Sequence, residues 1–254
     1  MSRLQRAGAA LIATRTARTH PQSPVRVTVC RVEDLTPSMR RVTFSGCDFP
    51  ALGSDQYARL LLPRDGRLVL PTSSRWYPEL LAMDPATRPW LRNYTLRNVR
   101  PGSVDIDFHL HDGDGRAVRW VLGTAVGDEV GLIEQGAPFA PVGSPLLVVA
   151  DDTGLPAALS ILADRPDAVA VLEVDGAVDE QPVSAGARAL WVQRSSGGGA
   201  LRTVQALDLA PGRAWVAGEA GLAAGVRRDL VSRGWSKRDV TFAGYYRRGR
   251  PQYS

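Results

Sequence analysis

The feature that most constrains the fold is a change in strand pattern close to Gly143. Between Val25 and Gly143, short β-rich runs such as VRVTVCRVEDL, RRVTFSG and SVDIDFHLH are separated by turn residues, which is typical of an antiparallel sheet or barrel. After Pro145 the runs are mostly apolar: PLLVVAD, AVAVLEV, ALWVQR, RAWVAGE and DVTFAGYY. Such runs indicate strands buried on both faces of a parallel sheet. The chain therefore combines two architectures.

Helical stretches at about 156–164 and 221–233 lie between some of the later runs and favour βαβ units. The sequence thus predicts the fold class β + α/β, an antiparallel β-barrel followed by a small parallel-sheet α/β domain. We expect three segments: a flexible N-terminal extension over residues 1–23, a barrel domain over 24–143, and an α/β domain with a C-terminal tail over 144–254.

Composition excludes several classes of protein. The net charge is +5, but basic and acidic residues are interspersed and form no basic stripe, so we expect no nucleic-acid partner. Cys30 and Cys47 are the only cysteines, too few for a four-thiolate cluster and without zinc spacing, so we expect no metal site. The apolar run at 7–13 is too short to act as a signal peptide, and no segment is long enough to span a bilayer. We expect a cytoplasmic monomer without membrane insertion.

The first candidate binding motif is Arg92-Asn-Tyr94-Thr95 in a predicted strand. Alternation places Arg92 and Tyr94 on one face and Thr95 on the other. The ring can pack on a flavin, the guanidinium can bind a phosphate through two hydrogen bonds, and the hydroxyl can bond the flavin edge. Taken alone, these residues also fit an ordinary barrel strand with surface and core positions.

The second candidate motif joins the end of the run SVDIDFHLH to a predicted helix start. Backbone N–H groups at this start, with Gly115 and Arg116 beside them, form a plausible seat for a diphosphate. His111 can contact an adenosine, although half-buried strand histidines would explain His109 and His111 equally well.

Two further motifs end strands of the predicted parallel sheet. Asp151 and Thr153 follow one run, and Gly218 and Glu219 follow another, where α/β sheets bind ligands. No G-x-G-x-x-G motif is present, so these positions favour a transiently bound pyridine nucleotide or a simple helix cap. Near the C-terminus, GYYRRG forms an aromatic and arginine cluster that could cover a flavin or nucleotide.

In this order and spacing, the motifs resemble the siderophore-interacting protein family of flavin-dependent ferric-siderophore reductases, in the ferredoxin-reductase-like superfamily. That family has an R-x-Y-T motif, a phosphate loop "LHG…GPASRWA", an "ADETALPA" turn, an "AGE" turn and a terminal "GYWRxG". Departures are Val118 in place of a hydroxyl residue, Tyr246 in place of tryptophan, and Gly154 in place of alanine.

The resemblance implies that the barrel binds FAD and that the α/β domain binds NADH or NADPH. The cofactor-binding residues it implies, together with the motifs above, are Arg92, Tyr94, Thr95, His109, His111, Gly115, Arg116, Ala117, Val118, Trp120, Asp151, Thr153, Gly218, Glu219, Tyr245 and Tyr246. Glu173, at the end of the second strand of the α/β domain, hints at a ribose contact and hence NADH.

The function implied is reduction of a ferric siderophore, with hydride passing from NAD(P)H to FAD and single electrons then reducing Fe(III) to Fe(II). No residue of the chain need act as catalytic acid, base or nucleophile. Candidate substrate-binding residues for an anionic ferric chelate are Arg75, Arg247, Arg248 and Arg250. The alternatives are a flavoenzyme of the same fold in biosynthesis or general flavin reduction, and a protein that binds FAD or a siderophore without turnover.

Overall fold

The structure, a computed structural model, describes residues 23–111, 115–139, 143–197 and 199–249. Contacts divide these residues into two compact units between Ala137 and Pro138. We call residues 23–137 the barrel unit and residues 138–249 the α/β unit. Most of the expected N-terminal extension, residues 1–22, lies outside the described residues.

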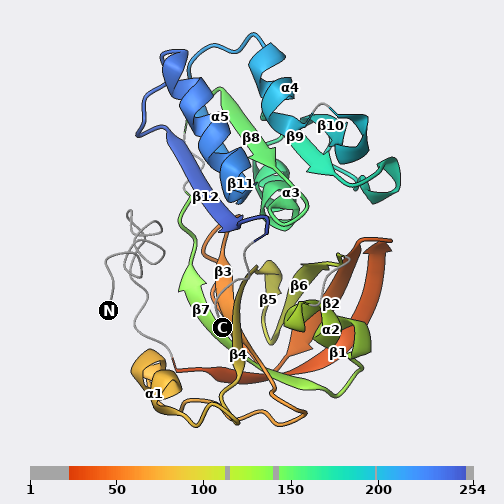
Figure 1. Ribbon diagram of the computed structural model, residues 1–254, viewed down its shortest axis with the longest axis vertical. Helices are drawn as coiled ribbons and strands as arrows, with labels where there is room; N and C mark the ends of the chain where they lie inside the picture. Colours follow the sequence, from red (N-terminus) through yellow and green to blue (C-terminus); the bar gives the residue numbers. More distant parts are fainter. Residues whose placement is uncertain (1–22, 112–114, 140–142, 198, 250–254) are drawn as a thin grey trace. The chain divides into compact units, whose positions relative to one another are not determined.

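The barrel unit is a seven-stranded antiparallel sheet in the order β4-β3-β7-β1-β2-β6-β5 (Figure 1). Its strands are β1 (Val25–Thr36), β2 (Met39–Ser45), β3 (Tyr57–Leu62), β4 (Trp90–Thr95), β5 (Arg97–Arg100), β6 (Ser103–His109) and β7 (Glu129–Gly136). Two short helices accompany them, α1 (Trp76–Ala82) and α2 (Arg116–Gly123).

The two edges of this sheet are brought together by the chain itself. β4 and β5 stand at opposite ends of the strand order, yet only Leu96 separates them in sequence. The run RNYTLRNV, which the sequence predicts as one strand, is therefore two strands with a break at the buried Leu96. Asn98 has a φ of 46°, a left-handed conformation that asparagine tolerates better than most residues. The break closes the sheet into a barrel.

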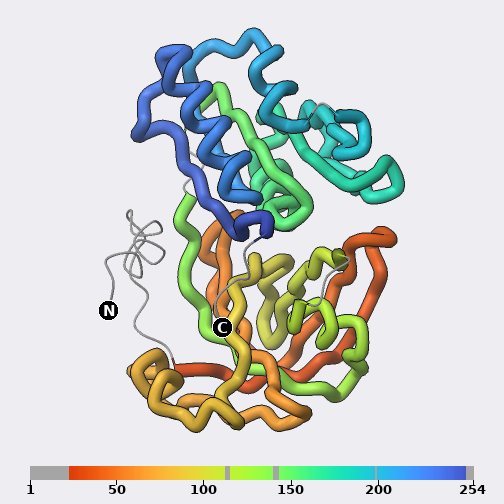
Figure 2. Tube along the Cα trace, in the orientation of Figure 1, coloured from red at the N-terminus to blue at the C-terminus, as the bar shows by residue number. Residues whose placement is uncertain are grey.

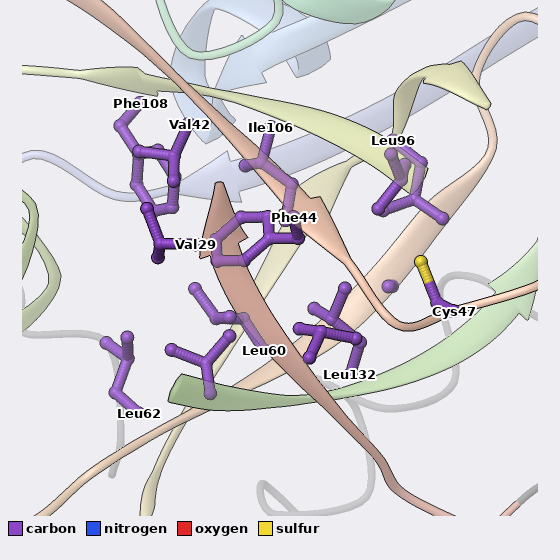
Figure 3. Close-up of a cluster of buried hydrophobic side chains, with 14 of the residues drawn as sticks. Val29, Val42, Phe44, Cys47, Leu60, Leu62, Leu96, Ile106, Phe108 and Leu132 are labelled. Carbon is purple, nitrogen blue, oxygen red and sulfur yellow. The ribbon is translucent and has the colours of Figure 1, made fainter. Parts of the chain in front are cut away.

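Alternate residues of the strands fill the barrel, and Figure 3 shows side chains of this buried cluster. On β3, Leu60 and Leu62 are at most 1% exposed and join the central cluster with Phe44, Ile106 and Leu132. Each fully buried side chain of this kind contributes about 1.5–3 kcal/mol to folding. The intervening Leu61 packs instead on a second cluster beneath α1, so β3 is buried on both faces.

The α/β unit is a five-stranded parallel sheet in the order β10-β9-β8-β11-β12, which confirms the predicted fold class (Figure 1). Its Cα trace runs from green to blue in Figure 2. Its elements are β8 (Leu146–Ala150), α3 (Leu155–Asp164), β9 (Val169–Val174), η2 (Ala177–Asp179), β10 (Arg188–Gln193), η3 (Arg194–Ser196), α4 (Ala200–Ala206), β11 (Arg213–Glu219), α5 (Ala220–Ser232) and β12 (Val240–Tyr246). Of the helices in the described ranges, none is long and apolar enough to cross a membrane.

The strand order places a topological switch point between β8 and β11. From β8 the chain moves outward to β9 and β10, and from β11 it moves the opposite way to β12. Residues of α4 and α5 pack on one face of the sheet against Leu147 and Val149. In open α/β sheets, ligands bind outside the carboxyl ends of the strands at such a point. Asp151 follows β8 and Glu219 ends β11, so both predicted motifs lie there.

Candidate functional site

In the barrel unit, β4 carries three half-buried side chains on one face. Trp90, Arg92 and Tyr94 pair with residues of β3 that point into the central cluster, and Trp90 and Tyr94 pack against that cluster. Thr95 lies on the opposite face and is 8% exposed. The alternation expected from sequence is therefore present, and it also places Trp90 in line with the two predicted residues.

Tyr94 offers a rigid aromatic surface. Its ring lies 4.5 Å from the ring of Phe108 by centroids, and burial raises the pKa of its hydroxyl, so the side chain is neutral at physiological pH. A neutral, half-buried ring held from behind by a second aromatic residue suits contact with a planar heterocycle.

Arg92 lies on the same strand face. Its Nη1 donates a hydrogen bond to the Leu91 carbonyl at 2.7 Å, and among the described residues no carboxylate forms an ion pair with it. Burial and, after it, the charge of Arg116 lower the pKa of Arg92, although a guanidinium remains charged at neutral pH. A half-buried cation without a carboxylate partner is suited to bind an anionic group.

The start of α2 offers backbone donors. Gly115 precedes the helix, and no side chain caps it. Ala117 and Val118 are buried, so only their N–H groups are available to a ligand. A Cβ added to Gly115 would lie 3.4 Å from the His111 ring, an ordinary contact, so the chain's own packing does not demand glycine there. The N–H groups at a helix start, together with Arg92 and Arg116, are suited to bind an anionic group.

The remaining predicted residues of this unit have mainly packing contacts. The ring of Trp120 lies 6.4 Å from Phe44 and 6.0 Å from Phe108, so it anchors α2 to the barrel core. His109 ends β6, and its ring is 5.9 Å from that of the exposed His111.

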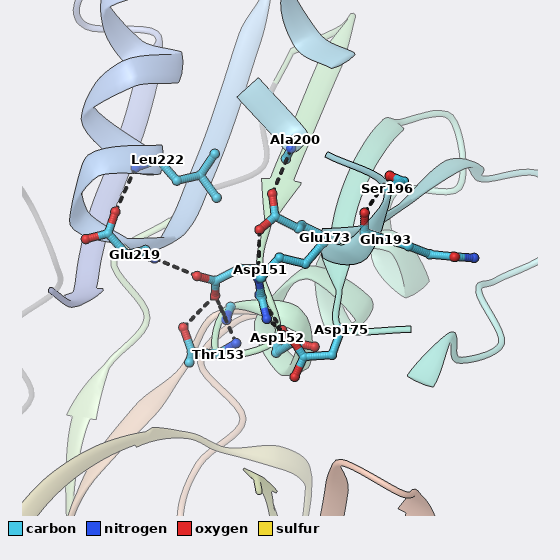
Figure 4. Close-up of polar contacts among 12 residues, drawn as sticks. Asp151, Asp152, Thr153, Glu173, Asp175, Gln193, Ser196, Ala200, Glu219 and Leu222 are labelled. Atoms are coloured by element: carbon cyan, nitrogen blue, oxygen red, sulfur yellow. Dashed lines mark hydrogen bonds and ion pairs between the residues drawn. The ribbon is translucent and has the colours of Figure 1, made fainter. Parts of the chain in front are cut away.

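In the α/β unit, Asp151 ties the two sides of the switch point together (Figure 4). It is 2% exposed, and its Oδ1 accepts hydrogen bonds from the Thr153 N–H at 2.9 Å and the Thr153 hydroxyl at 2.6 Å. Its Oδ2 accepts from the Glu219 N–H at 2.7 Å. Asp151 therefore fixes the turn after β8 against the end of β11.

Gly218 makes this contact possible. Its φ is 140°, and a Cβ at this position would stand 2.5 Å from Cγ of Asp151. No side chain fits there, so the glycine of the predicted motif serves the close approach of the Asp151 carboxylate.

Glu219 caps α5. Its Oε2 accepts hydrogen bonds from the N–H groups of Gly221, at 2.5 Å, and Leu222, at 3.1 Å, and its Oε1 accepts from the Arg248 N–H at 3.3 Å. Capping of α5 therefore accounts for this carboxylate.

The two terminal tyrosines lie at the end of β12, which pairs with β11. Tyr246 is half-buried, and burial together with the charge of Asp151 raises the pKa of its hydroxyl to about 12. Tyr245 falls at a bulge in this pairing, where Glu219 aligns with Tyr246. Tyr246 thus belongs to the same cluster as Asp151.

An ion-pair network that sequence reasoning missed lies beside the switch point. Arg194, at the end of β10, contacts Asp152 at 2.7 Å, Glu173 at 3.1 Å, and Asp175. The second oxygen of Glu173 accepts from the Ala200 N–H at 2.8 Å, at the start of α4. Both oxygens of Glu173 are thus engaged within the chain, which gives no support to the ribose contact suggested from sequence. The pattern of apolar residues in the sequence does not reveal such a network, because the network joins residues at the ends of three separate strands.

The candidate substrate-binding arginines divide between the units. Arg75 is exposed at the start of α1 in the barrel unit, whereas Arg247 and Arg248 are exposed after β12 in the α/β unit. Arg250 lies outside the described residues.

Comparison with known proteins identifies the family. A family model described as "Siderophore-interacting FAD-binding domain" matches residues 28–139, and one described as "Siderophore-interacting protein" matches residues 144–249. The solved structure of a siderophore utilization protein from T. fusca is 28% identical, with a TM-score of 0.82, and the match covers 95% of this chain and 99% of that one. The siderophore-interacting protein SipS from Aeromonas hydrophila is 27% identical with a TM-score of 0.77, covering 91% and 94% of the two chains.

A curated relative, the ferric acinetobactin reductase of Acinetobacter baumannii, is 33% identical over 88 residues. That match spans 33% of this chain and 31% of the relative's length. Because the two family models together account for most of the sequence and meet between the two units, this chain belongs to the siderophore-interacting protein family and carries its FAD-binding domain.

Proposed function

We propose that this protein is an NAD(P)H-dependent ferric-siderophore reductase of the cytoplasm. The proposal is supported by two features of the chain: the half-buried Arg92 and Tyr94 on β4 together with the uncapped start of α2, and a parallel sheet whose switch point is built from Asp151, Gly218 and Glu219. Bound FAD supplies the chemistry, since it accepts a hydride from a nicotinamide and passes single electrons to ferric iron.

The residues of the barrel unit bind and orient the cofactor. Tyr94 supports the flavin ring, and Arg92 with the N–H groups of α2 binds the diphosphate. Thr95, the residue after Tyr94, offers a hydroxyl that can bond the flavin edge. None of these groups exchanges a proton at neutral pH, which suits electron transfer without acid or base catalysis.

The residues of the α/β unit position the nicotinamide nucleotide. Both carboxylate oxygens of Asp151 and of Glu219 already accept hydrogen bonds from the chain, so their role is to hold the backbone at the carboxyl ends of β8 and β11. A nucleotide bound there would contact backbone groups and the tyrosines at the end of β12 rather than a free carboxylate. Weak, transient binding suits an electron donor that must leave after each turnover.

The substrate is an iron chelate. Siderophore oxygen donors are hard ligands that favour Fe(III), so reduction to Fe(II) loosens the chelate and releases the metal. Arg75, Arg247 and Arg248 are exposed cations that can attract an anionic ferric chelate.

The test is an anaerobic absorbance experiment on the purified full-length protein with FAD. NADH or NADPH is added first, then a ferric hydroxamate or catecholate siderophore with an iron(II) indicator. We expect the flavin absorbance to bleach with one or both nucleotides and iron(II) to appear at the rate at which flavin absorbance returns.

Two control reactions separate the alternatives. Free FMN and riboflavin as acceptors test general flavin reduction, and rapid turnover with them but none with ferric siderophores would reject the proposal in favour of a flavin reductase. Siderophore binding without any bleaching by either nucleotide would indicate a binding protein without turnover.

A further inference from the structure

Trp90, which belongs to none of the motifs found in the sequence, carries a cation on each face of its ring. Cζ of Arg116 lies 3.1 Å from the ring centroid, and Cζ of Arg64 lies 3.5 Å from it. Two carbon atoms that close to one centroid would collide if they shared a face. The two guanidinium groups therefore stack on opposite faces of the indole.

The three residues come from separate segments of the barrel unit. Arg64 follows β3 and is anchored by a hydrogen bond from its Nε to the Arg88 carbonyl at 2.8 Å. Trp90 begins β4, and Arg116 is the first residue of α2. Trp90 thus fixes the positions of two cations that the sequence separates widely.

Among the residues that the structure describes, this cluster holds positive charge without a carboxylate counter-ion. Among the described residues, no carboxylate forms an ion pair with Arg64, Arg92 or Arg116. A cation stacked on tryptophan gains from about 0.5 to 2 kcal/mol, which offsets part of the repulsion between the three guanidinium groups. Three neighbouring cations without acids are suited to bind a ligand that carries more than one negative charge.

The position of the cluster indicates which part of a ligand it meets. Trp90, Arg92 and Tyr94 lie on one face of β4 at intervals of two residues, or about 7 Å. A ligand with its flavin ring on Tyr94 and its first phosphate at Arg92 would extend its second phosphate toward Trp90. FMN ends at the first phosphate, whereas FAD continues to the second and to adenosine.

We propose that Arg64 and Arg116, held on the two faces of Trp90, form a second anion subsite that binds the adenosine-side phosphate of FAD and makes the protein select FAD over FMN. This inference rests on the FAD site of the proposed function. It also explains how the diphosphate is held although the buried Val118 of α2 offers no hydroxyl, because the guanidinium of Arg116 lies two residues earlier.

The experiment measures flavin binding to the full-length protein stripped of flavin, by fluorescence titration with FAD and with FMN, in the absence of nicotinamide nucleotide and siderophore. We expect Arg116→Ala to weaken FAD binding about tenfold. FMN binding should change by less than about twofold. The loss for FAD should shrink at high salt, because the lost contact is electrostatic.

Three further variants complete the test. Trp90→Leu should weaken FAD binding like Arg116→Ala, whereas Trp90→Phe, which keeps an aromatic face, should restore most of it. Arg67→Ala removes an exposed cation from the same hairpin as Arg64 and should leave both affinities unchanged.

Equal losses of FAD and FMN binding in Arg116→Ala would show that the cluster only supports the fold and would overturn the inference. Wild-type protein that binds FMN as tightly as FAD would overturn it as well. A protein that binds FAD selectively but releases no iron(II) would instead reject the proposed reductase function and leave this subsite standing.

Discussion

Replacing Gly218 by alanine tests how the switch point of the α/β unit is held together. The new Cβ would stand 2.5 Å from Cγ of Asp151 and 2.6 Å from each of its carboxylate oxygens. That carboxylate is 2% exposed and accepts hydrogen bonds from Thr153 and from the Glu219 N–H. The substitution must therefore displace the carboxylate or the end of β11, and the bond to the Glu219 N–H is the first to break.

The expected loss of stability has two parts. A hydrogen bond to a charged group contributes about 1.5–3 kcal/mol, and a buried donor left without a partner costs a similar amount. The φ of 140° at Gly218 adds about 1–2 kcal/mol of backbone strain for a residue with a side chain. Together these give a destabilisation of about 2.5–5 kcal/mol, large for a single methyl group added at the buried end of a strand.

The assay is urea unfolding with linear extrapolation, followed by far-UV circular dichroism. Gly234→Ala is the matched control, because Gly234 also has a positive φ, 91°, but no atom lies within 4 Å of the position of its Cβ. We expect this control to lose only the strain of about 1–2 kcal/mol. Equal losses for the two variants would refute the role assigned to Asp151.

Three more predictions concern single side chains. Iodoacetamide at about pH 8 should modify the exposed Cys30 in the native protein and spare Cys47, whose pKa burial raises to about 11, and mass spectrometry showing equal rates would contradict this. The hydrogen bond from Arg165 lowers the pKa of Asp167 to about 2, so wild type should be more stable than Arg165→Ala above about pH 4, and the difference should vanish as the pH falls to about 2; circular dichroism across this range is the check. Glu219→Ala removes the cap of α5 and should cost about 1 kcal/mol by urea unfolding, with Glu219→Asp retaining part of it; a neutral result for Glu219→Ala would contradict the cap.

The strands could be predicted because buried strands appear in the sequence as runs of apolar residues. All five residues of β8 are buried, as its continuous apolar run indicates, and β3 is buried on both faces. The same pattern also led to one wrong prediction, because RNYTLRNV looks like a single strand although the structure has two strands separated by Leu96. A break of one buried residue leaves the apolar pattern unchanged.

The short α-helices α1 and α4 have no comparable pattern in the sequence. α1 and α4 have seven residues each, and in α1 only Leu80 is buried. Two turns provide too few positions for a helical period to stand out, and Pro78 within α1 argues against a helix. What stabilises α1 is tertiary contact with Leu61 and Ile133, which are distant in sequence.

The candidate site shows a further limit of sequence reasoning. The motifs locate the residues of the site, but they do not show which groups of the chain form hydrogen bonds or ion pairs with them. In the α/β unit, the carboxylates of Asp151, Glu173 and Glu219 are all engaged by donors of the chain itself. In the barrel unit, Arg92 and Arg116 have no carboxylate partner among the described residues. Cations without a carboxylate partner are suited to bind an anion, whereas acids engaged by the chain leave mainly backbone groups for a ligand. This difference supports the proposed function, in which the barrel unit retains FAD and the α/β unit binds and releases a nicotinamide nucleotide in each turnover.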